Sequence, residues 1–189
     1  VVVISKLPLP LHILLDMAAV VCVFAALGLS VNDDLLNVFK SFKPLVGRGT
    51  ISRLKLDENR SVLVMDESYN ANPLSMKMTL DGFNSLYGNK ENKILILGDM
   101  SEGGIDTLNQ HKNLAQIVLD IAPSKVFLVG QYMTVLYYAL KEKLDVCYYS
   151  GVDALLENIT SHIPDDSYIF VKGSHSVGLD KVIEKFKGN

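Results

Sequence analysis

The amino-acid sequence predicts an α/β fold, with a Rossmann-like, mostly parallel sheet that carries helices on both faces. Short apolar segments without polar alternation recur along the chain, and such segments are typical of strands buried on both faces of a parallel sheet. Segments of helical length separate them, which indicates parallel strands joined by crossover connections. The N-terminal stretch instead reads as two successive helices with no strand between them. We therefore expect two parts, residues 1–46 and residues 47–189.

The expected elements follow from these patterns in chain order. Two helices come first, at Met17–Gly28 and from Asn32 to near Pro44, and the first is apolar all round, which predicts burial on most sides. Strands are expected at Thr50–Leu56, Ser61–Met65, Lys93–Gly98, Lys125–Gly130, Val146–Tyr149 and Tyr168–Val171. Further helices are expected at Pro73 to Gly88 (with Leu74, Met78, Phe83 and Leu86 on its apolar side), Asn109–Ile121, Tyr132–Lys141, Val152–His162 and Gly178–Phe186.

Composition narrows the functional classes. Hydrophobic residues make up 49% and charged residues 21% of the 189 residues, which favours a folded globular chain. A net charge of −3 gives no electrostatic case for a nucleic-acid partner. The two cysteines, Cys22 and Cys147, lie in apolar runs without metal-ligand spacing, so no metal site is expected.

The N-terminal stretch needs separate treatment because it is strongly apolar from Leu7 to Leu29. Prolines at its start, together with His12 and Asp16, leave an uncharged run shorter than the roughly 20 residues of a membrane span. We therefore expect a buried helix and no membrane span. The chain also begins in a strand-like run, Val1–Ile4, without an initiator methionine, and we expect it to be a piece of a longer protein.

The segment Ser61–Pro73 carries the first candidate site. A buried strand ends here in Asp66 and Glu67, followed by serine, tyrosine and asparagine side chains. Pro73 suits the first position of a helix, with Asn72 as its N-cap. Because ligands of open α/β sheets bind at the carboxyl ends of the strands, the sequence predicts a ligand site at this edge.

Two more glycine-bearing loops, Gly98-Asp-Met-Ser-Glu102 and Lys172-Gly-Ser-His-Ser176, follow later strands, and Gly47-Arg-Gly49 precedes the first strand. The arginine fork suits phosphate, and a lysine with a serine hydroxyl suits a carboxylate or phosphate. Strand-to-helix turns and a hinge turn would explain the same residue types without a ligand.

These segments resemble the MurF family, the UDP-N-acetylmuramoyl-tripeptide–D-alanyl-D-alanine ligases. Asp66-Glu-Ser-Tyr-Asn-Ala-Asn-Pro73 is similar to the family's D-D-S-Y-N-A-N-P, with Glu67 in place of the second Asp. The two strand-end loops resemble L-G-D-M-x-E-L-G and K-G-S-R, with Gly103 for Leu and His175 for Arg, and His111 matches a family histidine. His12-Ile-Leu-Leu-Asp-Met-Ala-Ala19 resembles H-N-x-x-N-x-x-A-A, although Ile13 and Asp16 replace both asparagines.

The resemblance implies a function. It implies an ATP- and Mg²⁺-dependent cytoplasmic ligase of peptidoglycan synthesis, which joins D-Ala-D-Ala to UDP-MurNAc-tripeptide through an acyl phosphate. Residues 1–46 would be the tail of the central ATP-binding domain, and residues 47–189 the C-terminal domain. The implied ATP-binding residues are His12, Arg48, Asp66 and Glu67, and the implied substrate-binding residues are Asn70, Ala71, Asn72, Asp99, Lys172, Gly173 and Ser174.

The sequence also indicates that this chain holds only part of such a ligase. It contains no G-x-x-x-x-G-K-[ST] phosphate loop, so the central and N-terminal domains and most Mg²⁺ ligands are expected outside this chain, and the chain alone is expected to be inactive. No catalytic residue is assigned within it. A non-catalytic binding module derived from a Mur ligase stays open, because His175 and the changed His12 helix depart from the family. A folylpolyglutamate synthase is disfavoured by Tyr69-Asn-Ala-Asn-Pro73.

Overall fold

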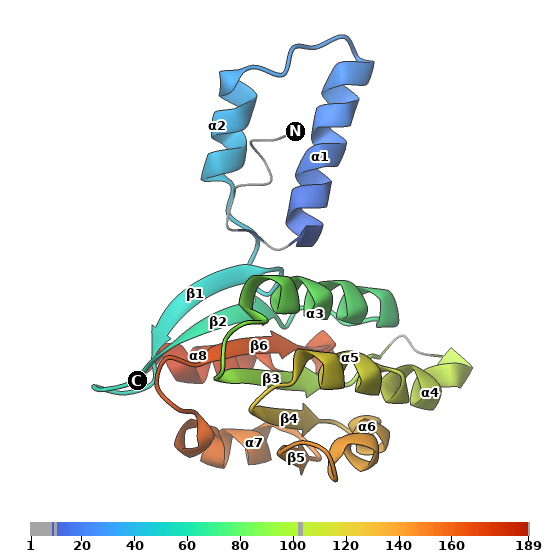
Figure 1. Cartoon of the computed structure of the whole chain (residues 1–189), viewed down its shortest axis with the longest axis vertical. Coiled ribbons are helices and arrows are strands. Elements are labelled where there is room, and N and C mark those ends of the chain that lie inside the picture. Colours follow the sequence, from blue (N-terminus) through green and yellow to red (C-terminus); the bar gives the residue numbers. More distant parts are fainter. Residues whose placement is uncertain (1–8, 10, 102–103, 189) are drawn as a thin grey trace.

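The structure, a computed structural model, describes residues 9, 11–101 and 104–188. Two helices, α1 (Leu11–Ala26) and α2 (Asp33–Ser41), form a pair that stands beside a layered α/β part (Figure 1). The pair meets this part through contacts between α1 and α3 (Pro73–Tyr87). The strand-like run Val1–Ile4 lies outside the described residues.

The sheet confirms the predicted fold class. Its strands run in the order β1-β2-β6-β3-β4-β5, and every neighbouring pair is parallel except β1 with β2. The strands are β1 (Thr50–Lys55), β2 (Ser61–Glu67), β3 (Lys93–Gly98), β4 (Lys125–Val129), β5 (Val146–Tyr149) and β6 (Tyr168–Lys172). This order places the ends of β2, β6 and β3 next to one another, although β6 comes last in the sequence.

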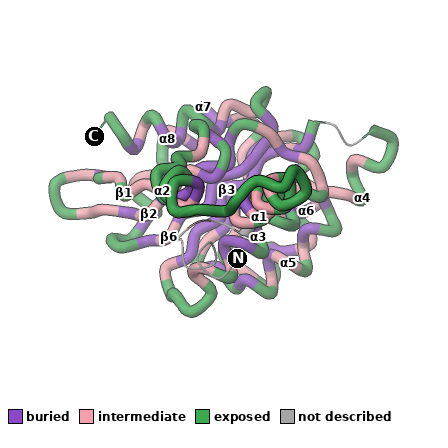
Figure 2. Tube along the Cα trace, turned by 90° about the horizontal axis from the view of Figure 1, so that it is seen from above, coloured by how far each residue is buried: buried purple, intermediate pink, exposed green. Residues whose placement is uncertain are grey.

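Helices cover both faces of the sheet. Buried side chains of α3, α5 (Leu114–Ile121) and α6 (Met133–Leu140) pack with one set of strand residues, which includes Leu95 and Leu97. Those of α7 (Val152–Asn158) and α8 (Asp180–Lys187) pack with the alternate set, which includes Ile94 and Ile96. Figure 2, which views the molecule from above, shows buried chain between these two layers of helices. Successive apolar residues of the central strands therefore point to opposite faces and serve two cores.

Helix boundaries follow local capping signals. Asn32 caps α2 by accepting a hydrogen bond from the Leu35 backbone N–H at 3.2 Å. Gly28 has a φ of +70° and closes α1, where the Leu29 N–H donates a hydrogen bond to the Phe24 carbonyl at 2.9 Å.

Two predicted helices are less regular than expected. The one at Asn109–Ile121 is divided at Asn113 into α4 (Thr107–Lys112) and α5, and the one at Val152–His162 ends as a 3₁₀ turn, Ile159–His162. Two more 3₁₀ turns occupy Gly104–Asp106 and His175–Val177.

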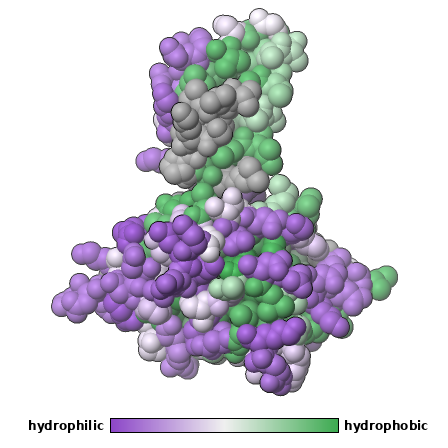
Figure 3. Space-filling model, viewed as in Figure 1, coloured by the Kyte–Doolittle hydropathy of each residue, from purple (hydrophilic) through white to green (hydrophobic). Residues whose placement is uncertain are grey.

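The prediction that the first helix is buried on most sides is wrong for the described residues. Helix α1 starts earlier than expected, at Leu11, and buries Ile13 and Met17 against Leu35 and Phe39 of α2. On its other side Val23 is 56% exposed, and the following Leu27 is 69% exposed. The green surface over α1 in Figure 3 shows this apolar face. One short partner helix is too little to cover a helix that is apolar all round.

The predicted apolar side of α3 is also wrong in part. Leu74 is 69% exposed and Met78 is exposed, whereas Phe83 is buried as predicted, together with Met76 and Leu80, which the prediction did not include. Leu74 and Met78 have helical spacing, as do Met76 and Leu80, so periodicity alone could not decide between them. The buried set is the one that lies against the sheet. In the described part of the chain, no helix combines the length and the apolar character of a membrane span.

Candidate functional site

A cavity of about 400 Å³ lies between the helical pair and the carboxyl ends of β2 and β6. The predicted site residues His12, Arg48, Glu67, Asn70, Asn72 and Lys172 all line it. Ile13, Asp16, Phe42, Pro44, Leu45, Gly47, Ser75, Met78 and Thr79 complete its wall. The cavity therefore joins a polar floor, made by strand ends, to an apolar wall from the segment after α2 and to mixed polar and apolar walls from α1 and α3.

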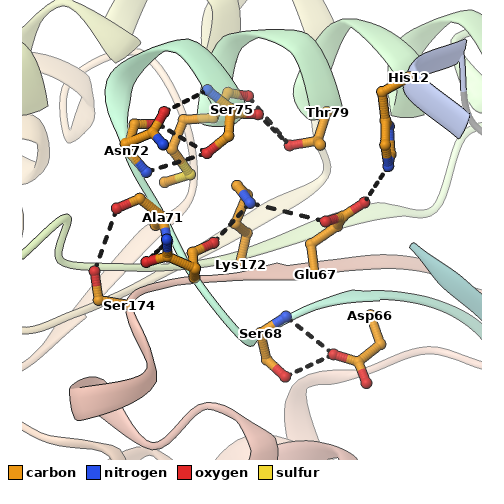
Figure 4. Close-up of polar contacts among 12 residues, drawn as sticks. His12, Asp66, Glu67, Ser68, Ala71, Asn72, Ser75, Thr79, Lys172 and Ser174 are labelled. Carbon is orange, nitrogen blue, oxygen red and sulfur yellow. Dashed lines mark hydrogen bonds and ion pairs between the residues drawn. The ribbon is translucent and has the colours of Figure 1, made fainter. Parts of the chain in front are cut away.

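Glu67 is at the centre of the polar floor (Figure 4). It ends β2, is 5% exposed, and its Oε1 lies 3.2 Å from Nε2 of His12 while its Oε2 lies 3.8 Å from Nζ of Lys172. Apart from the ion-pair contact with His12, Oε1 of Glu67 has no hydrogen-bond partner among the described residues, and Nδ1 of His12 has none there either, although both atoms are buried. Because buried polar atoms normally find partners, the hydrogen bonding of this pair is incomplete within the described residues.

Lys172 is 3% exposed and faces the same floor. Strand pairing places it opposite Glu67, and its Nζ donates a hydrogen bond to the Asn70 carbonyl at 2.8 Å. Burial lowers the pKa of Lys172; the Glu67 carboxylate opposes this shift and the Arg48 charge adds to it. Of the described carboxylates near these strand ends, Glu67 is the one that forms an ion pair with Lys172.

Gly47 and Gly49 place Arg48 at the cavity. Both glycines have positive φ, +76° and +90°, which other residues adopt only with strain. The Gly49 N–H donates to the Asp66 carbonyl at 2.9 Å, so the turn is fixed to the end of β2. A side chain at Gly49 would meet Oε1 of Glu67 and Nε2 of His12, each 3.2 Å from its first carbon. The turn thus brings an arginine to the cavity and keeps the backbone close to Glu67.

The loop after β2 is held by its own side chains. The side-chain oxygen of Asn72 accepts a hydrogen bond from the Ser75 N–H at 2.8 Å, and the Ser75 hydroxyl oxygen accepts one from the Asn72 N–H at 3.1 Å, which is a capping box for α3. Asn70 accepts from the Ala71 N–H at 2.8 Å, and Ala71 is fully buried. The two asparagines line the cavity with their acceptor oxygens engaged. A ligand would therefore meet their amide N–H₂ groups as donors.

The remaining predicted site residues do not line this cavity. Asp66 accepts hydrogen bonds from the N–H (3.0 Å) and hydroxyl (2.7 Å) of Ser68, so its carboxylate holds the turn. Asp99 accepts from the Met133 N–H at 2.9 Å and caps the start of α6, and burial raises the pKa of its carboxyl. Gly173 packs against the backbone of β3, where a side chain would lie 3.0 Å from the Cα of Gly98.

Ser174 links two strand-end loops. Its hydroxyl accepts a hydrogen bond from the Ser101 N–H at 2.7 Å and donates a longer one, 3.4 Å, to the Ala71 carbonyl. The loop of Ser101 is held in turn by buried His111, whose Nε2 accepts from the Met100 N–H at 2.9 Å while Nδ1 donates to the Thr107 carbonyl at 2.7 Å. Ser174 and His111 therefore hold the loops at the strand ends in place without lining the cavity themselves.

Sequence reasoning missed two features of the site. The apolar wall contains Phe42, Pro44 and Leu45, which lie in an irregular segment whose pattern gives no face. The guanidinium carbon of Arg48 lies 4.2 Å from the centre of the Tyr69 ring, a contact between loops that no spacing rule predicts.

The described residues fit a phosphorylated ligand better than a metal ion. Arg48, Lys172 and His12 offer cationic or donor groups around the buried Glu67 acceptor. In residues 9, 11–101 and 104–188 no group of three histidine, cysteine, aspartate or glutamate side chains is placed to hold a metal.

Comparisons with known proteins show which family the chain resembles. The family described as "Mur ligase, glutamate ligase domain" matches residues 52–175. The UDP-N-acetylmuramoyl-tripeptide–D-alanyl-D-alanine ligase of Rickettsia prowazekii is 33% identical over 141 residues, and that of Bacillus subtilis is 30% identical over 136. These matches cover 75% and 70% of this chain and 30% of each relative, so the chain spans about a third of their length.

Solved structures show the same fold. The MurF ligase of Thermotoga maritima in complex with ADP has a TM-score of 0.72 at 20% identity, over 93% of this chain and 38% of that one. A MurF structure from Acinetobacter baumannii has a TM-score of 0.77 at 20% identity, over 95% of this chain and 38% of that one. With the family match over most of the chain, this protein belongs to the Mur ligase family and contains its glutamate ligase domain, in a form similar to MurF.

Proposed function

We propose that this chain is the C-terminal part of an ATP-dependent ligase of the MurF type, which adds D-Ala-D-Ala to UDP-N-acetylmuramoyl-tripeptide in peptidoglycan precursor synthesis. The observation that carries the proposal is the cavity in which His12, Arg48, Glu67 and Lys172 meet. The curated relatives bear the name of this activity, and one solved structure of similar fold contains ADP.

The division of labour follows the two parts of the structure. Residues 1–46 would be the tail of a central ATP-binding domain, and residues 47–189 the amino-substrate domain. The exposed apolar face of α1 supports this division, because a further domain packed on that face would remove it from water. The Mg²⁺ ligands would then lie mostly in that further domain, and the whole protein would work in the cytoplasm.

The cavity residues suit two tasks in this reaction. ATP would supply the phosphoryl group that activates the tripeptide carboxylate as an acyl phosphate. Arg48 would bind phosphate oxygens through its planar fork, and the Glu67 carboxylate would accept a hydrogen bond from a ribose hydroxyl or from a group at the hinge. The fork and this buried acceptor would thus orient the nucleotide while the apolar wall excludes water.

The dipeptide would meet the other end of the polar floor. Its carboxylate needs a cation or amide donors, and Asn70, Asn72 and Lys172 present such groups at the cavity. Ala71, Gly173 and Ser174 would support these residues rather than touch the dipeptide, because they do not line the cavity. Asp99 would act at a distance through α6, which it caps.

The test is a turnover assay on the full-length protein. We expect phosphate release from ATP that requires both UDP-MurNAc-tripeptide and D-Ala-D-Ala, whereas the 189-residue chain alone should release none above a buffer blank. The control omits each substrate in turn. ATP-independent binding of a ligand with no turnover by the full-length protein would favour the alternative, a non-catalytic module derived from a Mur ligase.

A further inference from the structure

The side chain of Arg48 has an unusual set of neighbours for an arginine at a cavity. Among the described residues, no carboxylate lies within ion-pair distance of its guanidinium. Glu67 shares the cavity but is engaged with His12 and Lys172 instead. The group that does lie against Arg48 is the ring of Tyr69, 4.2 Å from the guanidinium carbon. An aromatic face attracts the cation without using its N–H donors, which lie in the guanidinium plane.

The backbone fixes Tyr69 beside the arginine turn. The Tyr69 N–H donates a hydrogen bond to the Gly47 carbonyl at 3.1 Å. The two residues are so close that a side chain at Gly47 would place its first carbon 3.0 Å from Cβ of Tyr69. The absence of a side chain at Gly47 therefore lets the two loops approach, and the ring is held next to Arg48 by main-chain contacts.

The ring has a second contact that ties it to the loop after β6. The His175 ring lies 5.7 Å from the Tyr69 ring, with an angle of 26° between their planes. His175 follows Ser174, which is hydrogen bonded to the loop after β3. Tyr69 remains 49% exposed, so the fold does not need it as a core residue. A half-exposed tyrosine that contacts an arginine and a histidine from two other loops is better suited to organising a surface than to filling a core.

We propose that Tyr69 is a positioning residue for Arg48, which it holds at the cavity so that the free N–H donors face an oxyanion. The oxyanion is a phosphoryl group or a carboxylate, two groups that the arginine fork binds in the same way. This inference rests on the proposed function in one respect only, namely that the cavity binds an anionic reactant. It adds that part of the affinity for this anion depends on an aromatic ring that need not touch it.

The test is a double-mutant cycle on binding by the full-length protein, measured by calorimetry with ADP, pyrophosphate and D-Ala-D-Ala. Tyr69→Leu should weaken binding of the anion by about three- to tenfold, because the cation–π contact is lost. Tyr69→Phe keeps the ring and should stay within about twofold of the original protein. In an Arg48→Met background, Tyr69→Leu should have almost no further effect, since the group that it positions is gone.

Each outcome decides the matter. A loss for ADP and pyrophosphate identifies a phosphoryl site, and a loss for D-Ala-D-Ala alone identifies a carboxylate site. Equal losses from Tyr69→Leu with and without Arg48, or no loss at all, would overturn the proposal, as would a protein that binds none of the three probes. A protein that binds the probes with the expected coupling but shows no turnover would instead contradict the proposed ligase activity. Melting temperatures of all variants separate lost binding from lost folding.

Discussion

Gly130→Ala should lower the free energy of unfolding by about 3 kcal/mol, a large fraction of the stability of a domain of this size. Gly130 follows β4 and has a φ of +117°, where an alanine is strained. The added carbon would also lie 2.4 Å from the carboxyl carbon of Asp99. Asp99 cannot move away without releasing the N–H groups of Tyr132 and Met133 at the start of α6. The backbone strain and the loss of the helix cap, which alone costs about 1 kcal/mol, therefore both lower the free energy of unfolding.

Gly151→Ala is the matched control for this prediction. Gly151 precedes α7 in the loop after the neighbouring strand, has an extended φ of −159°, and has no atom within 4 Å of an added carbon. Its substitution should change the unfolding free energy by less than about 0.5 kcal/mol. Both variants are compared by urea unfolding. Equal small effects at the two positions would show that Asp99 is not a fixed cap.

Lys172→Met should have the second largest effect, a loss of about 3 kcal/mol of stability. The substitution removes one partner of a buried ion pair and leaves Glu67, with His12 as its remaining neighbour, without the lysine charge. It also leaves the Asn70 carbonyl without its donor. In the double variant Lys172→Met, Glu67→Gln the uncompensated charge is absent as well, so part of the loss should be recovered.

The measurement is again urea unfolding, combined with steady-state kinetics of the full-length protein. A single variant as stable as the original, or a double variant that is less stable than the single one, would show that the pair does not stabilise the fold. If Lys172 also binds the dipeptide, the variant should raise the Michaelis constant for D-Ala-D-Ala and leave that for ATP nearly unchanged. An equal rise for both, together with a lower melting temperature, would assign Lys172 a structural role alone.

The sheet could be predicted from the sequence because each strand is a short apolar run with a clear end. The β-branched and aliphatic run from Val62 ends at Met65, and the structure extends the strand by only two residues, to Glu67. The orientation of α3 was not predictable in the same way. Its residues from Leu74 and from Met76 form two competing helical faces, and only contact with the sheet selects the second.

The site shows a similar limit. Glu67 and Lys172 each follow a predicted strand, and the carboxyl ends of parallel strands meet at one edge of the sheet. Arg48 precedes the first strand, so only the family resemblance indicated that it belongs to the site. Which carboxylate would pair with Lys172 depended on the register of β2 with β6, which joins residues more than a hundred positions apart. Asp66, one residue earlier, points to the other side of the strand and forms a turn with Ser68.

The most direct test of the account is the structure of the full-length protein with bound ADP. The account predicts phosphate oxygens within hydrogen-bond distance of the Arg48 guanidinium, in the cavity between α1 and α3, with Tyr69 still against the arginine. Phosphates bound instead at the ends of β3 to β5, in the cavity that Ser101, Gly130 and Ser150 line, with Arg48 contacting only Tyr69, would contradict it.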